Sequence, residues 1–156
     1  MRVYARRGTY GNGAVEGWLA RERAAGLFEQ QTYDRAAESA RHIRSRLLAL
    51  LHEFKRAGRR VAGYGASAKG NTLLNYCGIG TDLLEYIVDR NPLKQGLYSP
   101  GRHIPIVSPE KLSEDRPDYL LLLAWNFAEE IMEEQAEFRA QGGQFILPIP
   151  MPEAVA

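Results

Sequence analysis

Strands and helices alternate along the second part of the chain, and this alternation limits the fold more than any other feature of the sequence. Short apolar runs predict strands, and the stretches between them predict helices with short connections. The predicted strands are RRVAGYG at 59–65, LEYIVDR at 84–90, the extended start of 103–112, DYLLLLAW at 118–125 and QFILPIP at 144–150. The fully apolar run at 118–125 is typical of a strand covered on both faces. We therefore expect an α/β fold: a Rossmann-like, doubly wound, mainly parallel sheet.

The first part of the chain predicts an arm rather than part of the sheet. Residues 2–5 have the composition of a short strand, residues 15–30 are compatible with a helix, and residues 33–57 predict a longer helix that ends at a glycine. Its apolar positions recur every three or four residues, which places on one face Ala36, Ala40, Ile43, Leu47, Leu50 or Leu51, and Phe54. The sequence thus predicts an N-terminal strand and helical arm at 1–58 and a Rossmann-like domain at 59–156.

Composition and charge exclude several classes of function. The chain carries 20 basic and 19 acidic side chains, so its net charge of +1 gives no reason to expect nucleic acid or membrane partners. The longest apolar run is too short to span a bilayer, and no signal peptide is recognisable, so a cytoplasmic protein is expected. Cys77 is the single cysteine, so neither an internal disulfide nor a cysteine-based metal cluster is expected.

A glycine-rich turn lies between the first predicted strand of the sheet and a helix predicted from Lys69. Gly63, Gly65 and Ala68 form the pattern G-x-G-x-x-A. Gly63 would allow a tight turn, Gly65 would let the backbone approach a phosphate, and Ala68 would let helix and strand pack closely. The free N–H groups of the helix would then face an anion. A tight turn without a ligand is the alternative, because glycines serve turns everywhere.

The residues around the turn discriminate between phosphate ligands. Lys69 precedes Gly70, whereas the P-loop pattern needs lysine after its last glycine, so a nucleoside triphosphatase is not expected. Asp89 stands at the end of the next strand, where an NAD site places a carboxylate for the ribose hydroxyls. Lys69 is unusual for a nicotinamide site and indicates a more highly charged pyrophosphate, unless it is a solvated lysine. S-adenosylmethionine (SAM) has no phosphate and a positive sulfonium, so Lys69 disfavours it at this turn.

Further polar and aromatic residues follow the predicted strands. Candidate ligand-binding residues at these strand ends are Asp89, Arg90, Asn91, Trp125 and Asn126. Lys94 belongs either to this group or to a polar turn with no ligand. Trp125 and Asn126 also suit structural roles, capping the core and the next helix. His103, in a second polar loop, has no nucleophile or metal ligand to pair with, so a structural role is expected.

Several separated motifs, in order, resemble one family. GYGASAKGNTLLN, YIVDRNPLKQGLYSPGRHIPI, PDYLLLLAWNF and GGQFILPIP are closely similar to the C-terminal domain of SAM-dependent sugar C-methyltransferases, over residues 60–150. These enzymes methylate a keto sugar carried on a nucleoside diphosphate, in deoxysugar and antibiotic pathways. The resemblance implies that a zinc-binding piece and a central SAM-binding domain precede this region and carry the general base. The chain is then expected to be a fragment or a free-standing C-terminal domain, inactive alone and without a cofactor of its own.

The resemblance also implies a role for the glycine turn. The turn would hold the diphosphate of a nucleotide sugar, with a dTDP keto-deoxysugar as the expected substrate. The expected substrate-binding residues are Gly63, Gly65, Ala66, Ser67, Ala68, Lys69, Asn71, Asp89, Arg90, Asn91, Trp125 and Asn126. No catalytic residue and no metal ligand is expected here, and the expected partners are the nucleotide sugar and the upstream SAM-binding domain. Two alternatives stay open: an NAD(P)-binding oxidoreductase or sensor domain, and a non-catalytic interaction module whose long helix docks on a partner.

Overall fold

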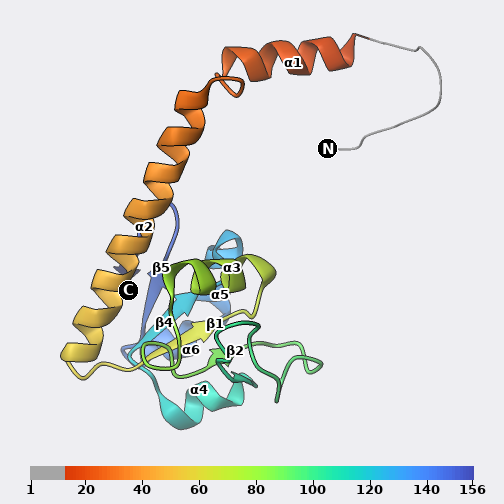
Figure 1. Ribbon diagram of the computed structural model, residues 1–156. Coiled ribbons are helices and arrows are strands. Elements are labelled where there is room, and N and C mark those ends of the chain that lie inside the picture. Colours follow the sequence, from red (N-terminus) through yellow and green to blue (C-terminus); the bar gives the residue numbers. More distant parts are fainter. Residues whose placement is uncertain (1–12) are drawn as a thin grey trace. The chain divides into compact units, whose positions relative to one another are not determined.

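The structure is a computed structural model that describes residues 13–156 (Figure 1). The strand predicted at residues 2–5 lies outside this range. The chain divides into two compact units, Met1–Ala40 and Arg41–Ala156. The division falls inside the long helix α2, Gln30–Arg56, so the second half of α2 belongs to the same unit as the sheet.

The smaller unit holds helix α1, Ala14–Ala24, and the first residues of α2. The Tyr33 hydroxyl donates a hydrogen bond of 2.7 Å to the Leu27 carbonyl, which ties the turn after α1 to the start of α2. The Arg21 guanidinium lies 5.1 Å from the centre of the Trp18 ring, a cation–π contact within α1.

The larger unit is built on a six-stranded sheet in the order β3-β2-β1-β4-β5-β6. The strands are β1 (Val61–Tyr64), β2 (Ile87–Val88), β3 (Ile106–Val107), β4 (Tyr119–Leu122), β5 (Gln144–Leu147) and β6 (Glu153–Val155). The first five run parallel, and β6 pairs antiparallel with β5. The predicted α/β class with a doubly wound, mainly parallel sheet is confirmed. The strand order reverses around β1, and in such sheets ligands bind beyond the carboxyl ends of the strands at that point.

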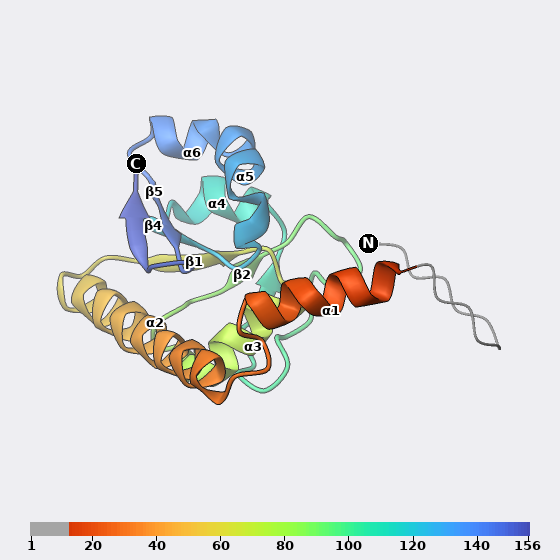
Figure 2. The same cartoon turned by 90° about the horizontal axis from the view of Figure 1, so that it is seen from above.

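Helices cover both faces of this sheet, as the view from above shows (Figure 2). The remaining helical elements are α3 (Ala68–Cys77), α4 (Glu110–Asp115), the 3₁₀ turn η1 (Trp125–Phe127), α5 (Ala128–Glu134) and α6 (Ala136–Ala140). The second half of α2 packs with α3 on one face, whereas α4, α5 and α6 pack on the other. Each connection between successive parallel strands therefore crosses one face of the sheet, as a helix or as a loop.

Alternate side chains along β4 and Leu123, which directly follows it, pack into the cores on opposite faces of the sheet. Leu121 and Leu123 pack with the helix residues of the first face, and Leu120 and Leu122 pack with those of the second. All four side chains are at most 1% exposed, which confirms the prediction of a strand buried on both faces. The first face receives Leu47, Leu51, Leu73, Leu74 and Cys77, and the second receives Leu112, Ile131 and Phe138.

Three elements differ most from their predictions. The helix predicted at 126–143 is divided into η1, α5 and α6, and Gln135 between the last two leaves helical geometry at φ −97° and ψ 29°. The Gln135 backbone N–H still donates to the Ile131 carbonyl at 2.9 Å, and its side-chain Nε2 donates to the Tyr64 hydroxyl at 3.2 Å. The strand predicted at 84–90 is only two residues long, Ile87–Val88. Strand β6 is absent from the prediction, since three residues are too few for a periodic signal.

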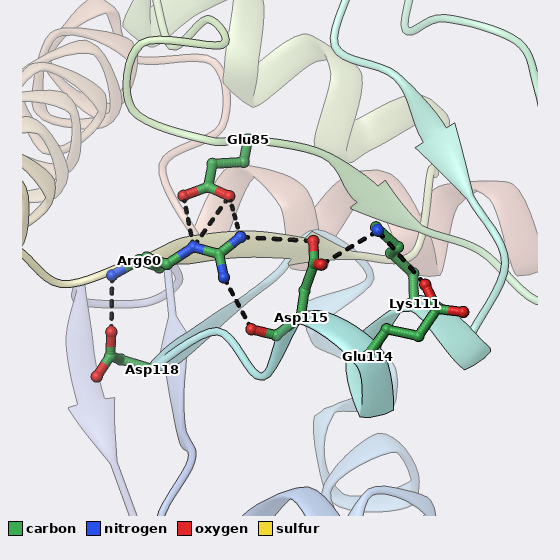
Figure 3. A network of polar contacts seen from close by, with 6 residues as sticks. All are labelled: Arg60, Glu85, Lys111, Glu114, Asp115 and Asp118. Atoms are coloured by element: carbon green, nitrogen blue, oxygen red, sulfur yellow. Dashed lines mark hydrogen bonds and ion pairs between the residues drawn. The ribbon is translucent and has the colours of Figure 1, made fainter.

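Charged side chains join the segments at the edge where the parallel strands begin (Figure 3). Arg60, directly before β1, donates its backbone N–H to Asp118 at 2.8 Å, and its guanidinium binds Glu85 at 2.5 Å and the Asp115 carbonyl at 2.8 Å. The hydrogen bond to Glu85 is the main cause of a raised Arg60 pKa. Lys111 extends the network through a 3.1 Å contact with the Asp115 carboxylate. This network fixes the edge of the sheet opposite the glycine-rich turn.

Candidate functional site

Gly63 lies inside β1, before the chain turns. A Cβ on Gly63 would come within 3.1 Å of Ile87 Cγ1 and Leu123 Cδ1 and within 3.2 Å of Leu84 Cδ2. Because real Cβ atoms seldom have such close neighbours, packing of the core favours glycine at position 63, and the turn predicted at this glycine does not occur there.

The turn itself is made at Gly65. Its φ of 85° lies in the left-handed region that favours glycine, and a Cβ there would lie 2.9 Å from Ala124 Cβ. The Gly65 N–H donates to the Val88 carbonyl at 2.7 Å, which continues the β1–β2 pairing into the turn. Two constraints, backbone conformation and space, therefore select glycine at this position.

The close approach of α3 to the sheet is made by Gly70, not by Ala68 as predicted. A Cβ on Gly70 would lie 2.6 Å from Leu123 Cβ and 2.9 Å from the Leu123 carbonyl oxygen. Ala68 is exposed. Ser67 precedes α3 as its N-cap: its hydroxyl accepts from the Gly70 N–H at 3.0 Å and donates to Leu123 O at 2.8 Å.

Only part of the turn's backbone is free for a ligand. The amides of Ala66 and Ser67 donate to the Asp89 carboxylate at 2.7 Å and the Gly65 carbonyl at 2.8 Å. The amides of Ala68 and Lys69, at the start of α3, make no hydrogen bond with any residue that the structure describes. These two N–H groups are the donors that this helix terminus offers to an anion.

Asp89 braces the turn. Its carboxylate accepts from the Ala66 N–H at 2.7 Å, the Asn91 N–H at 2.8 Å and Lys94 Nζ at 3.1 Å, and the residue is 8% exposed. Lys94 Nζ also donates to the Ala66 carbonyl at 2.9 Å, so both polar groups of Ala66 are held by one ion pair. The carboxylate that a ribose would need is thus used by the protein.

The Lys69 ammonium lies over two aromatic rings at the end of β4. Lys69 Nζ is 5.1 Å from the centre of the Trp125 ring and 5.6 Å from that of Phe127. Both distances are typical of cation–π contacts. Lys69 forms no ion pair with a carboxylate among residues 13–156.

The remaining polar candidates have other surroundings. The Arg90 guanidinium is paired with Glu134 on α5. The Asn91 side chain accepts from the Leu93 N–H at 3.0 Å, as in an Asx turn. Asn126 lies exposed in η1 and makes no side-chain cap.

A mainly apolar pocket opens beside the start of α3; it is called the α3 pocket below and has a volume of about 420 Å³. Its floor is made by Leu74, Ile87, Ile106 and Leu123. Its rim carries four predicted residues, Ala66, Ser67, Ala68 and Asn71, and five from the loop between β2 and β3: Lys94, Leu97, Tyr98, Ser99 and Pro100.

Other predicted residues surround two separate hollows. Gly65, Asp89, Arg90 and Asn91 line a hollow of about 320 Å³ on the α5 side, together with Tyr64, whose burial raises the pKa of its hydroxyl. Trp125 and Asn126 line a hollow of about 440 Å³. Gly63 and Lys69 line none of these three spaces. The predicted residues therefore meet at one edge of the sheet without forming one pocket.

Sequence reasoning leaves Lys94 open and does not select the other four loop residues of the α3 pocket. The polar loop from Tyr98 to His103 is recognisable, but nothing in it indicates that Tyr98 and Pro100 lie against α3. His103, with φ 51°, is exposed and lines none of the three spaces. Its backbone N–H donates to the Ser99 carbonyl at 3.0 Å, which holds it in the loop.

Two further findings concern metal ions and membranes. Across residues 13–156, no group of three or more His, Cys, Asp or Glu side chains is arranged to hold a metal ion. None of the helices described here combines the length and apolar composition of a membrane span.

Two comparisons with known proteins agree with each other. The family described as "C-methyltransferase C-terminal domain" matches residues 1–150. The chain is also similar to the C-methyltransferase NovU of Streptomyces niveus, with 43% identity over 143 residues, covering 92% of this chain and 34% of that protein. The chain therefore spans about a third of the length of this curated relative.

Proposed function

The chain belongs to the C-methyltransferase C-terminal domain family, and on this premise we propose that it binds the substrate of a longer SAM-dependent C-methyltransferase. The proposed substrate is a keto-deoxysugar carried on a nucleoside diphosphate, with dTDP as the carrier. The longer protein would supply the methyl-transfer machinery from an upstream SAM-binding domain, and this chain alone would be inactive. A cytoplasmic location fits this proposal.

The first turn of α3 is the observation that carries the proposal. The Ala68 and Lys69 N–H groups have no partner among the described residues, and they stand beyond the carboxyl end of β1, where the strand order reverses. A diphosphate at this place would receive two backbone hydrogen bonds and the positive end of the helix dipole. The amides of Gly65, Ala66 and Ser67 are already bonded, so their contribution is to shape the turn.

Lys69 supplies a cation beside these amides. Its ammonium rests on the Trp125 and Phe127 rings, and the long, flexible side chain can turn from them toward a bound phosphate. Trp125 and Asn126 would then border the ligand at the same edge of the sheet.

The residues at the turn do not fit SAM. The strand-end carboxylate of Asp89, which would bond the hydroxyls of an adenosine ribose, is buried and bonded to the turn itself. Lys69 would repel the sulfonium of SAM. We therefore assign no step of methyl transfer to this chain, and the general base is expected in the upstream domain. The same use of Asp89 disfavours the NAD(P)-binding alternative.

Calorimetric titration of the chain with dTDP, beside NADH and SAM, tests the proposal. We expect dTDP to bind and Lys69→Ala to weaken it by about 1–3 kcal/mol, the size of a charge-assisted hydrogen bond. Lys55→Ala, in the last turn of α2, is the matched control and should leave binding unchanged. Binding of NADH in place of dTDP would favour the oxidoreductase alternative. If dTDP binds neither this chain nor the chain joined to its upstream domain, only the interaction-module alternative remains.

A further inference from the structure

The α3 pocket is unsuited to a diphosphate, although it adjoins the amides proposed to bind one. We propose that it holds the base of the nucleotide, a flat and uncharged ring with a ring carbonyl, placed against Tyr98 with its carbonyl toward Asn71. This proposal rests on the proposed function and adds the position and chemistry of the nucleoside.

The floor of the pocket selects an uncharged group. Leu74, Ile87, Ile106 and Leu123 belong to the apolar core between α3 and the sheet, and each is at most 6% exposed. A charged phosphate would lose its hydration against these side chains, whereas a heterocyclic ring would gain by burying its faces.

Most polar groups of the rim are already bonded to the protein. Ser67 bridges Gly70 and Leu123, and Lys94 is held by Asp89 and the Ala66 carbonyl. Asn71 is different: its Oδ1 receives a 3.4 Å contact from Asn75, but its Nδ2 donates to no residue in the part of the chain described. This free amide donor suits a ring carbonyl.

Tyr98 offers an aromatic face at the rim. It is 63% exposed, a large exposure for an aromatic residue that lines a pocket. Its loop is nevertheless fixed, because Pro100 accepts a 3.0 Å hydrogen bond from Asn75 on α3. Because this loop is already held in place before a ligand binds, a base can stack on the Tyr98 ring at little entropic cost.

The geometry joins this pocket to the proposed diphosphate site. Ala68 and Asn71 line the pocket from the first turn of α3, the same turn that presents the free amides. A nucleotide can therefore place its base in the pocket and its phosphates at the amides. Asp89, Arg90 and Asn91, which the sequence also predicts as substrate-binding residues, line the hollow on the α5 side instead.

Titration of dTDP and of pyrophosphate against four forms of the full chain tests this. The forms are the wild type, Tyr98→Ala, Asn71→Ala and the control Leu93→Ala. Leu93 lies in the same loop as Tyr98 and is 83% exposed, but it does not line the pocket. We expect Tyr98→Ala to weaken dTDP at least about fivefold, as loss of a stacked base does, and Asn71→Ala to weaken it less. Pyrophosphate should bind all four forms equally.

Saturation-transfer NMR of dTDP on the wild type supplies a second measurement. We expect the strongest transfer to the methyl group and ring proton of thymine. Strongest transfer to the deoxyribose, or unchanged dTDP affinity in both Tyr98→Ala and Asn71→Ala, would overturn the base assignment while leaving the proposed function intact. If dTDP and pyrophosphate bind neither this chain nor the chain joined to its upstream domain, the proposed function fails and this assignment fails with it.

Discussion

The glycines around β1 are favoured for different physical reasons. Core packing favours Gly63, the positive φ and the contact with Ala124 favour Gly65, and the close approach of α3 to Leu123 favours Gly70. The pattern that suggests a phosphate site is thus largely a pattern of close packing. The proposed anion site instead uses the backbone amides of Ala68 and Lys69, which the glycine pattern itself does not specify.

Gly70→Ala should destabilise the larger unit by about 1–3 kcal/mol, because its Cβ would overlap backbone and side chain of Leu123. Gly17→Ala is the matched control, since Gly17 also lies in a helix, but a Cβ added there would have nothing within 4 Å. Alanine there should be neutral or stabilising by up to about 1 kcal/mol. Urea unfolding of both variants measures the difference; equal midpoints would contradict the packing argument.

Asp89→Asn should cost about 1–3 kcal/mol of unfolding free energy. An amide has one acceptor oxygen where the carboxylate has two, so one of the Ala66 and Asn91 N–H groups would face an NH₂ group, and Lys94 would lose its counter-charge. Asp82→Asn is the control, because Asp82 is exposed and carries no ion pair in the described structure. If urea unfolding shows that Asp89→Asn loses no more unfolding free energy than the control, Asp89 does not stabilise the turn.

At the scale of elements, local sequence signals decide which parts of the fold are predictable. The strand at 118–125 and the helix ended by Gly58 carry strong local patterns, and both are present as β4 and α2. The break at Gln135 and the pairing of β6 depend on contacts with distant residues, which periodicity does not report. Part of the site is predictable for the same reason, since Ala66 to Asn71 are contiguous, whereas Tyr98 meets them only through the tertiary fold.

The network at the start of β1 and β4 should make stability depend on acid pH. Burial alone would raise the pKa of Asp118, but hydrogen bonds from the Arg60 N–H and the Arg59 guanidinium outweigh it and lower the pKa below the ordinary 3.8. A carboxyl whose folded pKa is lowered stabilises the fold fully above its unfolded pKa. This contribution is lost as the pH falls below about 4, through the folded pKa.

Asp118→Asn should therefore flatten the fall in unfolding free energy between about pH 5 and pH 3. Urea unfolding at several pH values in this range measures the slope. Glu129→Gln, an exposed carboxylate outside the network, serves as the control. A wild-type slope in Asp118→Asn would show that Asp118 does not contribute.

At the scale of the whole molecule, the division of the chain can be tested by truncation. The sequence predicts a domain at 59–156, whereas the compact unit of the structure begins at Arg41 and includes Leu47 and Leu51, which are at most 1% exposed. A chain beginning at Arg41 should fold cooperatively. A chain beginning at Arg59 should lose about 3–6 kcal/mol, the burial of two leucines, and expose the covered sheet face. Equal stability of the two fragments would support the predicted boundary.

The single thiol of the chain has a practical consequence. Cys77 lies at the end of α3, 2% exposed, and burial raises its pKa, so the folded protein should react slowly with thiol reagents. The rate of thiol labelling then reports how often α3, the helix that presents the proposed binding amides, opens. A nucleotide bound at the opposite end of α3 should slow the labelling of Cys77. Ligands can therefore be screened by mass spectrometry without an assay for methyl transfer.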